Sequence, residues 1–109
     1  MRDLIGRFPD LNAVFAINDP SALGAISALT SANKLEAVKI VSVDGAAEAI
    51  AAIKKGKLVA TSAQFPKEIG QVAAEQAYKH LAGEPVAKDI KTRVELIDRE
   101  NADAFLAQR

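Results

Sequence analysis

Residues 13–20 have the sequence Ala-Val-Phe-Ala-Ile-Asn-Asp-Pro, and this stretch decides the expected fold class. Five apolar residues in succession are typical of a buried strand. The polar residues that follow predict a turn into a helix, with Asp19 as the N-cap and Pro20 as the first helical residue. A buried strand that leads directly into a helix is the repeating unit of α/β sheets.

The same unit recurs along the rest of the chain. Short β-branched runs alternate with longer Ala-rich stretches whose apolar residues return at helical spacing. The expected strands are 13–17, 38–43, 58–63 and 92–97. The expected helices are one that begins at Pro20 and stops near Asn33, followed by 46–55, 66–82 and 102–108. Strand–helix alternation with apolar strands implies right-handed crossovers, so we predict a three-layer α/β/α fold with a mostly parallel sheet.

Length and composition narrow the possible function classes. The 109 residues allow one modest core, and 14 basic residues balance 14 acidic ones, which argues against a nucleic-acid-binding role. The chain has no Cys, so disulfides, thiolate chemistry and Cys-ligated metals are excluded. The sequence contains no run of 18 apolar residues, so no transmembrane helix is expected. Residues 1–7 are too short and too polar for a signal peptide. The signal peptide of a secreted parent would therefore lie upstream.

Three of the predicted strands end in hydrogen-bonding side chains, namely Asn18, Asp44 and Gln64. Ligands of open α/β sheets bind beyond the carboxyl ends of the strands, so these residues are the candidate ligand-binding set. A carboxylate accepts two hydrogen bonds and each amide both donates and accepts, which suits the hydroxyl groups of a sugar. Gly45, directly after Asp44, allows a close approach of backbone or ligand.

The residues alone leave a structural interpretation open for each member of this set. Asp44 could cap the helix that begins near Ala46, because Asp is a preferred N-cap residue. Asn18 could be a turn residue before the Asp19 cap. Gln64 has no standard capping role before a Phe-Pro pair, although it could simply be solvated.

Three motifs resemble those of a known family. Residues 13–19 with 22–25 (AVFAIND and ALGA), residues 41–45 (VSVDG), and residues 62–66 with the following Ile69-Gly70 resemble, in order and spacing, type I periplasmic sugar-binding proteins. This family includes the ribose-binding group, and its fold is shared by transcription regulators of the lactose-repressor family. The resemblance covers nearly the whole chain and implies a periplasmic-binding-protein-like fold of type I.

The resemblance also implies a function and a set of partners. In ribose-type receptors the residues at the positions of Asn18, Asp44 and Gln64 contact the sugar. The parent protein would then be the periplasmic substrate-binding component of an ABC-type transporter, with a pentose or hexose as ligand and a membrane permease as partner. It would not be an enzyme and would need no cofactor or metal. Ser42 and Val43 stand where the family usually has Gly and Phe, which leaves the identity of the sugar open.

Members of this family are much longer, so the resemblance implies that the chain is the C-terminal part of a two-lobed receptor. Residues 1–64 would form the C-terminal lobe, 65–90 a helical segment that crosses to the N-terminal lobe, and 91–109 the returning strand and terminal helix. Helix 66–82 would then lack its usual sheet. We expect it to dock on the sheet of this chain or to form a homo-oligomer through its apolar stripe of Ile69, Val72 or Ala73, Ala77 and Leu81. With one wall of the cleft missing, we expect weak sugar binding or none.

Two other functions are compatible with parts of the pattern. One is the effector-binding core of a lactose-repressor-type regulator, which the upstream sequence would distinguish from a receptor. The other is a small flavodoxin-like enzyme, but His80 is the only histidine and there is no Gly-rich phosphate loop or metal-spaced cluster. Asp44 and Glu48, four residues apart at a helix start, are better explained by the helix dipole than by a catalytic carboxylate pair.

Overall fold

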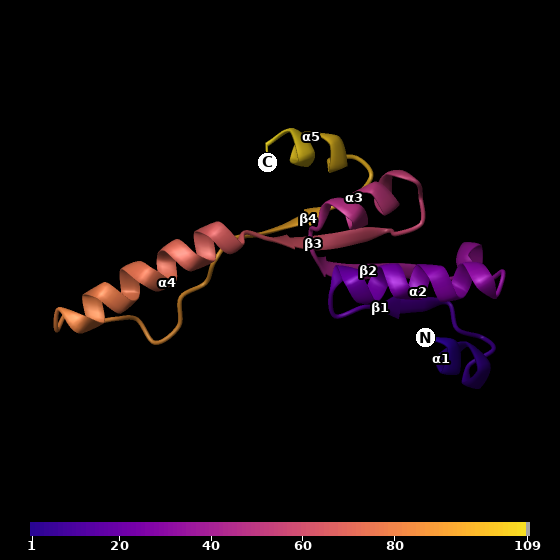
Figure 1. Ribbon diagram of the computed structural model, residues 1–109, viewed down its shortest axis with the longest axis horizontal. Coiled ribbons are helices and arrows are strands. Elements are labelled where there is room, and N and C mark those ends of the chain that lie inside the picture. Colours follow the sequence, from indigo (N-terminus) through magenta and orange to yellow (C-terminus); the bar gives the residue numbers. More distant parts are fainter. Residues whose placement is uncertain (109) are drawn as a thin grey trace. The chain divides into compact units, whose positions relative to one another are not determined.

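The computed structural model describes residues 1–108, in which helices and strands alternate as predicted (Figure 1). The elements are α1 (Arg2–Arg7), β1 (Ala13–Phe15), α2 (Asp19–Ser31), the 3₁₀ helix η1 (Leu35–Ala37), β2 (Lys39–Asp44), α3 (Ala47–Lys54), β3 (Ala60–Gln64), α4 (Pro66–Leu81), β4 (Val94–Ile97) and α5 (Ala102–Ala107). They form two compact units. Unit 1 comprises Met1–Ala63 and the residues from Glu95 onward, and unit 2 comprises Gln64–Val94.

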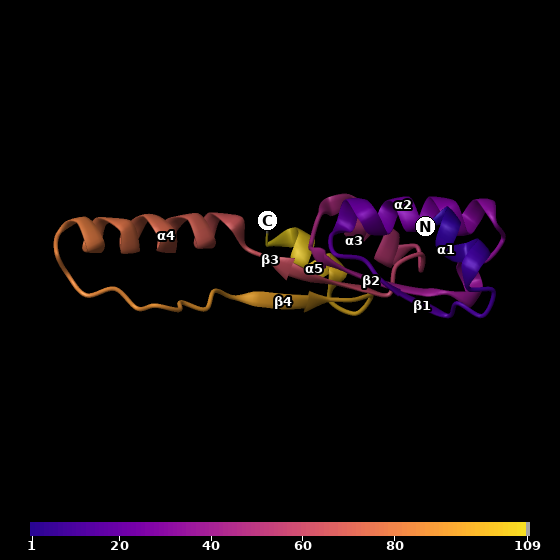
Figure 2. The same cartoon turned by 90° about the horizontal axis from the view of Figure 1, so that it is seen from below.

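The sheet has the strand order β1-β2-β3-β4. β1 pairs with β2 in parallel from Ala13↔Lys39 to Phe15↔Val41, and β2 pairs with β3 in parallel from Val41↔Ala60 to Asp44↔Ala63. β4 lies at the edge beside β3 and runs in the opposite direction (Figure 2). The predicted α/β class with a mostly parallel sheet is therefore confirmed. Parallel pairing also brings the carboxyl ends of β1, β2 and β3 to one edge of the sheet.

The core of unit 1 lies between this sheet and its helices. α2 packs on β2 and on α3, and α3 also contacts α5. α2 and α3 cover the same face of the sheet (Figure 2). The largest apolar side chains that are fully buried are Leu29, Ile40, Ile50, Ile53 and Ile97. The predicted burial of the first strand is wrong, since no residue of β1 is buried and Phe15, its last residue, is 70% exposed.

The helix ends follow the predicted stop signals, but one predicted cap is wrong. Asn33, Gly56 and Gly83 have positive φ just beyond α2, α3 and α4, as expected at the C-terminal ends of helices. At the start of α2, however, the N-cap is Asn18 and not Asp19, because the Asn18 side chain accepts a hydrogen bond from the backbone N–H of Ser21 at 2.9 Å. Asp19 is already inside the helix.

Unit 2 consists of α4 and the irregular segment that leads into β4. No residue of α4 is buried, and Leu81, from the predicted apolar stripe, is 83% exposed. The start of α4, in contrast, makes contacts with the returning segment. The Arg93 guanidinium stacks 3.6 Å from the Phe65 ring centroid, and its Nε lies 3.8 Å from Oε2 of Glu68. This cation–π contact and ion pair hold the first turn of α4 to the end of the returning segment.

Gly45 occupies the turn between β2 and α3, where no other residue fits. Its φ is +81°, and a Cβ atom there would lie 2.6 Å from the Ala63 Cβ and 2.9 Å from the Ala63 Cα. Part of that clash is with the backbone of β3, which cannot move aside without disturbing the sheet. The turn after β2 therefore depends on glycine for both its backbone conformation and its closeness to β3.

We predict that Gly45→Ala lowers the free energy of unfolding by about 1–3 kcal/mol, because the added methyl group overpacks the β2–β3 contact. The matched control is Gly24→Ala in α2, where a Cβ atom meets nothing within 4 Å. That change should raise stability by roughly 0.5–1 kcal/mol, since alanine is favoured over glycine inside a helix. Urea unfolding of both variants measures the difference. Equal stabilities for the two variants would show that the turn tolerates a side chain.

Candidate functional site

The three predicted ligand residues each follow or end a strand. Asn18 comes after β1, Asp44 is the last residue of β2, and Gln64 is the last residue of β3. Asp44 pairs in register with Ala63, the residue immediately before Gln64. Asn18 and Asp44 belong to unit 1, whereas Gln64 is the first residue of unit 2. In chain position, all three therefore stand at carboxyl ends of parallel strands, where open α/β sheets bind their ligands.

Asn18 has a structural role as the N-cap of α2. Its Oδ1 accepts from Ser21, which fixes the side chain at the start of the helix. Its Nδ2 donates to no other residue in the part of the chain that the structure describes. Capping and ligand contact are therefore compatible, because they use different atoms of the same amide.

The capping alternative for Asp44 is wrong. The N-cap of α3 is Ala46, and no side chain within residues 1–108 caps this helix. The half-buried Asp44 carboxylate makes no hydrogen bond or ion pair with the described residues. Asp44 is one of two non-glycine residues with positive φ in residues 1–108, at 130°. A carboxylate without a partner, on a backbone conformation that side chains rarely adopt, is the most distinctive feature of this edge of the sheet.

Gln64 is exposed at the junction with unit 2. Its side chain makes no hydrogen bond with another residue in the described chain. The following residue, Phe65, is held by the stacked Arg93 side chain. The side-chain amide of Gln64 is therefore available to bond a ligand. The backbone of Gln64 is held on one side by β3 and on the other by the start of α4.

The residue that the sequence analysis missed is Asp19. Its side chain is fully buried and accepts hydrogen bonds from Ser42 Oγ at 2.5 Å, from Thr61 Oγ1 at 2.7 Å and from the Ala46 backbone N–H at 2.6 Å. Ser42 and Thr61 are buried too, and they pair in register across β2 and β3. Two hydroxyl residues at facing positions of apolar strands were the available signal, since buried hydroxyls need partners.

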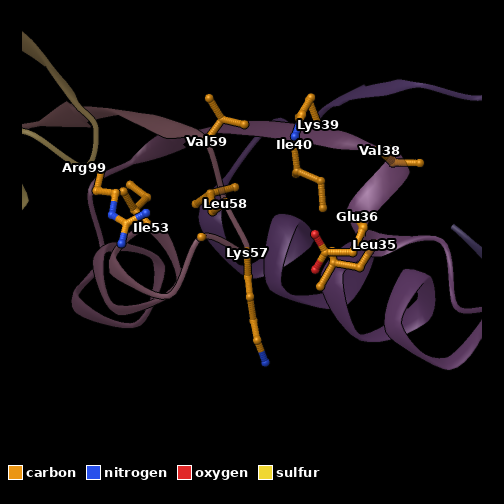
Figure 3. Close-up of a pocket in the computed structure, with 11 residues that line it drawn as sticks. Leu35, Glu36, Val38, Lys39, Ile40, Ile53, Lys57, Leu58, Val59 and Arg99 are labelled. Carbon is orange, nitrogen blue, oxygen red and sulfur yellow. The ribbon is translucent and has the colours of Figure 1, made fainter.

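Two cavities of the described chain lie away from Asn18, Asp44 and Gln64. One cavity of about 190 Å³ is lined by residues at the start of β2 and β3, including Lys39 and Val59, at the opposite end of the strands from Asp44. Figure 3 shows its basic side chains, Lys39, Lys57 and Arg99, pointing apart and not toward a common centre. This arrangement offers no focused binding site.

Two further features bear on the kind of chemistry available. Within residues 1–108, no group of three potential metal-ligating side chains comes together. None of the helices in that range is both long and apolar enough to cross a membrane. What the strand ends offer is hydrogen bonding by two amides and one carboxylate, a set suited to a polyhydroxylated ligand.

Sequence comparison shows that the chain is similar to ribose import binding proteins. The ribose import binding protein of Salmonella typhimurium is 42% identical over 100 residues, covering 92% of this chain and 33% of that protein. The ribose import binding protein of Bacillus subtilis is 43% identical over 96 residues, covering 88% of this chain and 31% of that protein. The chain thus spans about a third of the length of these relatives, which are import receptors and not enzymes.

Solved structures agree in fold. An ABC-transporter solute-binding protein from Actinobacillus succinogenes with bound D-allose has a TM-score of 0.83 at 28% identity, covering 94% of this chain and 36% of that one. Another ABC-transporter solute-binding protein, from Bacillus halodurans with bound myo-inositol, has a TM-score of 0.84 at 32% identity. The match covers 99% of this chain and 37% of that one.

A family model for the periplasmic binding protein domain matches residues 1–85, which confirms the resemblance inferred from the three sequence motifs. The parallel strands, the polar strand ends and these relatives lead to the same conclusion. The chain belongs to the periplasmic binding protein domain family.

Proposed function

We propose that this chain is the C-terminal part of the substrate-binding component of an ABC-type monosaccharide transporter, with Asn18, Asp44 and Gln64 as its sugar-contacting residues. The observation that carries the proposal is the Asp44 carboxylate, which ends β2 without any partner in the described chain. The relatives support the ligand class, since they are ribose import receptors and solute-binding proteins solved with D-allose or myo-inositol.

In this proposal each residue has a role set by its free atoms. The two oxygens of Asp44 accept hydrogen bonds from neighbouring hydroxyl groups of the sugar ring. Asn18 donates through the Nδ2 that its capping bond leaves free. Gln64 both donates and accepts. Charge-assisted bonds to a carboxylate are stronger than bonds between neutral groups, so Asp44 contributes most to affinity.

The strained backbone of Asp44 supports a functional role. Positive φ at a residue with a side chain costs on the order of 1–3 kcal/mol and persists where function or surrounding structure requires it. Its neighbour Gly45 supplies positive φ at no such cost, so a second glycine would be the less strained choice. Retaining an aspartate at this position, without a structural bond for its carboxylate, favours ligand binding as the reason.

The proposed mechanism requires a second lobe. A sugar would bond to strand-end residues of both lobes, and a hinge would close around it. The receptor would work in the periplasm and deliver its sugar to a membrane permease. Residues 1–109 would supply one wall of the cleft, so we expect them to bind sugar weakly or not at all by themselves.

The residues 65–90 are assigned in this proposal to the segment that crosses to the N-terminal lobe. No residue of α4 is buried, which fits a helix that packs against the N-terminal lobe in the whole receptor. In the absence of that lobe, we propose that the apolar stripe of α4 associates with a second copy of the chain. The regulator alternative is not favoured, because the curated relatives described above are import receptors.

One prediction of this proposal concerns ligand binding by the full-length receptor that contains this sequence. D-Ribose at about 100 times its Kd should stabilise the folded receptor by about 2.7 kcal/mol, seen as a rise in Tm. Asp44→Ala should abolish that rise, whereas Asp10→Ala, an exposed carboxylate without hydrogen bonds, should keep it. A full thermal shift in the Asp44→Ala receptor would refute the assigned role.

Another prediction separates the strain at Asp44 from its binding role. Asp44→Gly should be more stable to urea than Asp44→Ala by about 1–2 kcal/mol, because glycine adopts positive φ without a Cβ penalty. Neither variant should bind sugar, since both lack the carboxylate. If the alanine variant proves as stable as the glycine variant, the backbone of Asp44 is not strained in solution.

A further inference from the structure

A buried polar cluster, which bonds to the two residues that follow Asp44, joins four elements of unit 1. At its centre is Asp19 in the first turn of α2, with Ser42 from β2, Thr61 from β3 and the backbone of Ala46 at the start of α3. No Lys, Arg or His side chain of the described residues pairs with the Asp19 carboxylate. Its negative charge is therefore stabilised by these three hydrogen bonds.

This cluster holds the two backbone amides that follow Asp44. Asp19 Oδ2 accepts directly from the N–H of Ala46 at 2.6 Å. Thr61 Oγ1, which donates to Asp19 Oδ1, accepts from the N–H of Gly45 at 3.3 Å. Both peptide groups after Asp44 are thus fixed by the same carboxylate, one directly and one through a hydroxyl.

Fixing these amides also fixes the backbone of Asp44. Residues 44 and 45 both have positive φ, at 130° and 81°, and neither belongs to a helix. A turn of this kind needs bonds that outweigh its strain. The close contact of Gly45 with Ala63 limits the turn from one side, and the bond from Ala46 to Asp19 holds it from the other.

We propose that Asp19 is a positioning residue that holds the Asp44–Ala46 turn in the conformation that presents the Asp44 carboxylate to the sugar. The conformational part of this inference stands on the hydrogen bonds above, and its effect on affinity rests on the proposed sugar-binding function. Asp19 touches no ligand in this account, because its side chain is fully buried and both its oxygens are occupied.

A role limited to fold stability is the competing explanation, and a set of variants distinguishes the two. Asp19→Leu/Ser42→Ala/Thr61→Val replaces every interior side chain of the cluster by an apolar one of similar shape. Replacing both partners of a buried bond in this way restores much of the stability that a single deletion loses. It nevertheless removes the acceptors that Thr61 Oγ1 and Asp19 Oδ2 provide for the backbone N–H groups of Gly45 and Ala46. Ser42→Ala is the matched control, because it removes one bond to Asp19 and leaves both amides held.

Nuclear magnetic resonance of the 109-residue chain tests the conformational part without any ligand. In the triple variant, the exchange of the Ala46 amide should accelerate by at least about tenfold relative to the Lys39 amide, which bonds to Asn12 in the sheet. The three-bond coupling between the amide and α protons of Asp44 should rise as its φ leaves the positive region. Ser42→Ala should change neither quantity. If the triple variant does not fold, Thr61→Val alone should accelerate exchange of the Gly45 amide, because it removes the bond to Thr61 Oγ1, while Ser42→Ala still should not.

Titration of the full-length receptor with D-ribose tests the effect on affinity. The triple variant should bind D-ribose at least about tenfold more weakly than the unaltered receptor. Its Tm should be lowered only slightly by comparison. In receptors that carry Asp44→Asn, which keeps one acceptor oxygen and so retains weak binding, the cluster substitutions should lower the affinity by a smaller factor, because Asp19 acts through Asp44. An undiminished loss in that background would show that Asp19 acts by another route.

The proposal would be overturned if the folded triple variant kept the proton coupling of Asp44 and the amide exchange rate of Ala46 unchanged. It would also be overturned if the triple variant bound D-ribose as tightly as the unaltered receptor. An equal loss of affinity in Ser42→Ala would favour a general stability effect and would also overturn it. Failure of the unaltered receptor to bind any monosaccharide would refute the proposed function instead. The exchange and coupling measurements would still decide the conformational part.

Discussion

The architecture of unit 1 depends on one buried carboxylate. Asp19 connects α2 to both central strands and to the start of α3 through Ser42, Thr61 and Ala46. Apolar packing by residues such as Leu29 and Ile50 brings these elements together, but it is non-directional and does not define how the strand ends are arranged. The hydrogen bonds of Asp19 have fixed directions, so they specify the positions of the turns at the carboxyl edge of the sheet.

This constraint explains why an energetically unfavourable turn persists after β2. Asp44 and Gly45 both have positive φ, and the turn presses against Ala63 on the neighbouring strand. Bonds to the following amides stabilise the turn, so the Asp44 carboxylate needs no structural bond of its own. A side chain that is held in place by its backbone, and not by its own contacts, keeps its hydrogen-bonding capacity for a ligand.

The sequence predicted the elements well because their signals are local. The stop signals at Asn33, Gly56 and Gly83 depend on neighbouring residues only, and the structure confirms them. The apolar run at 13–17 predicted a strand, but β1 is limited to Ala13–Phe15 and none of its residues is buried, because burial depends on what covers the sheet and not on local sequence. The cap of α2 was assigned one residue too late, since Asn18 and Asp19 are both good caps by residue type. The choice between them depends on Ser42 and Thr61, which are distant in sequence, so local patterns could not reveal it. The same long-range bonds determine the role of Asp19, and only the two hydroxyl residues Ser42 and Thr61 in otherwise apolar strands hinted at it. The strand-end positions of Asn18, Asp44 and Gln64, in contrast, followed directly from the strand boundaries.

The central claim is that Asp44 binds the sugar through both carboxylate oxygens. A crystal structure of the full-length receptor grown with D-ribose tests this most directly. The account predicts each oxygen of Asp44 within about 3 Å of a different ribose hydroxyl, with the Asp44–Ala46 turn in its present conformation. A bound ribose that leaves the Asp44 carboxylate in contact with solvent alone would contradict the account.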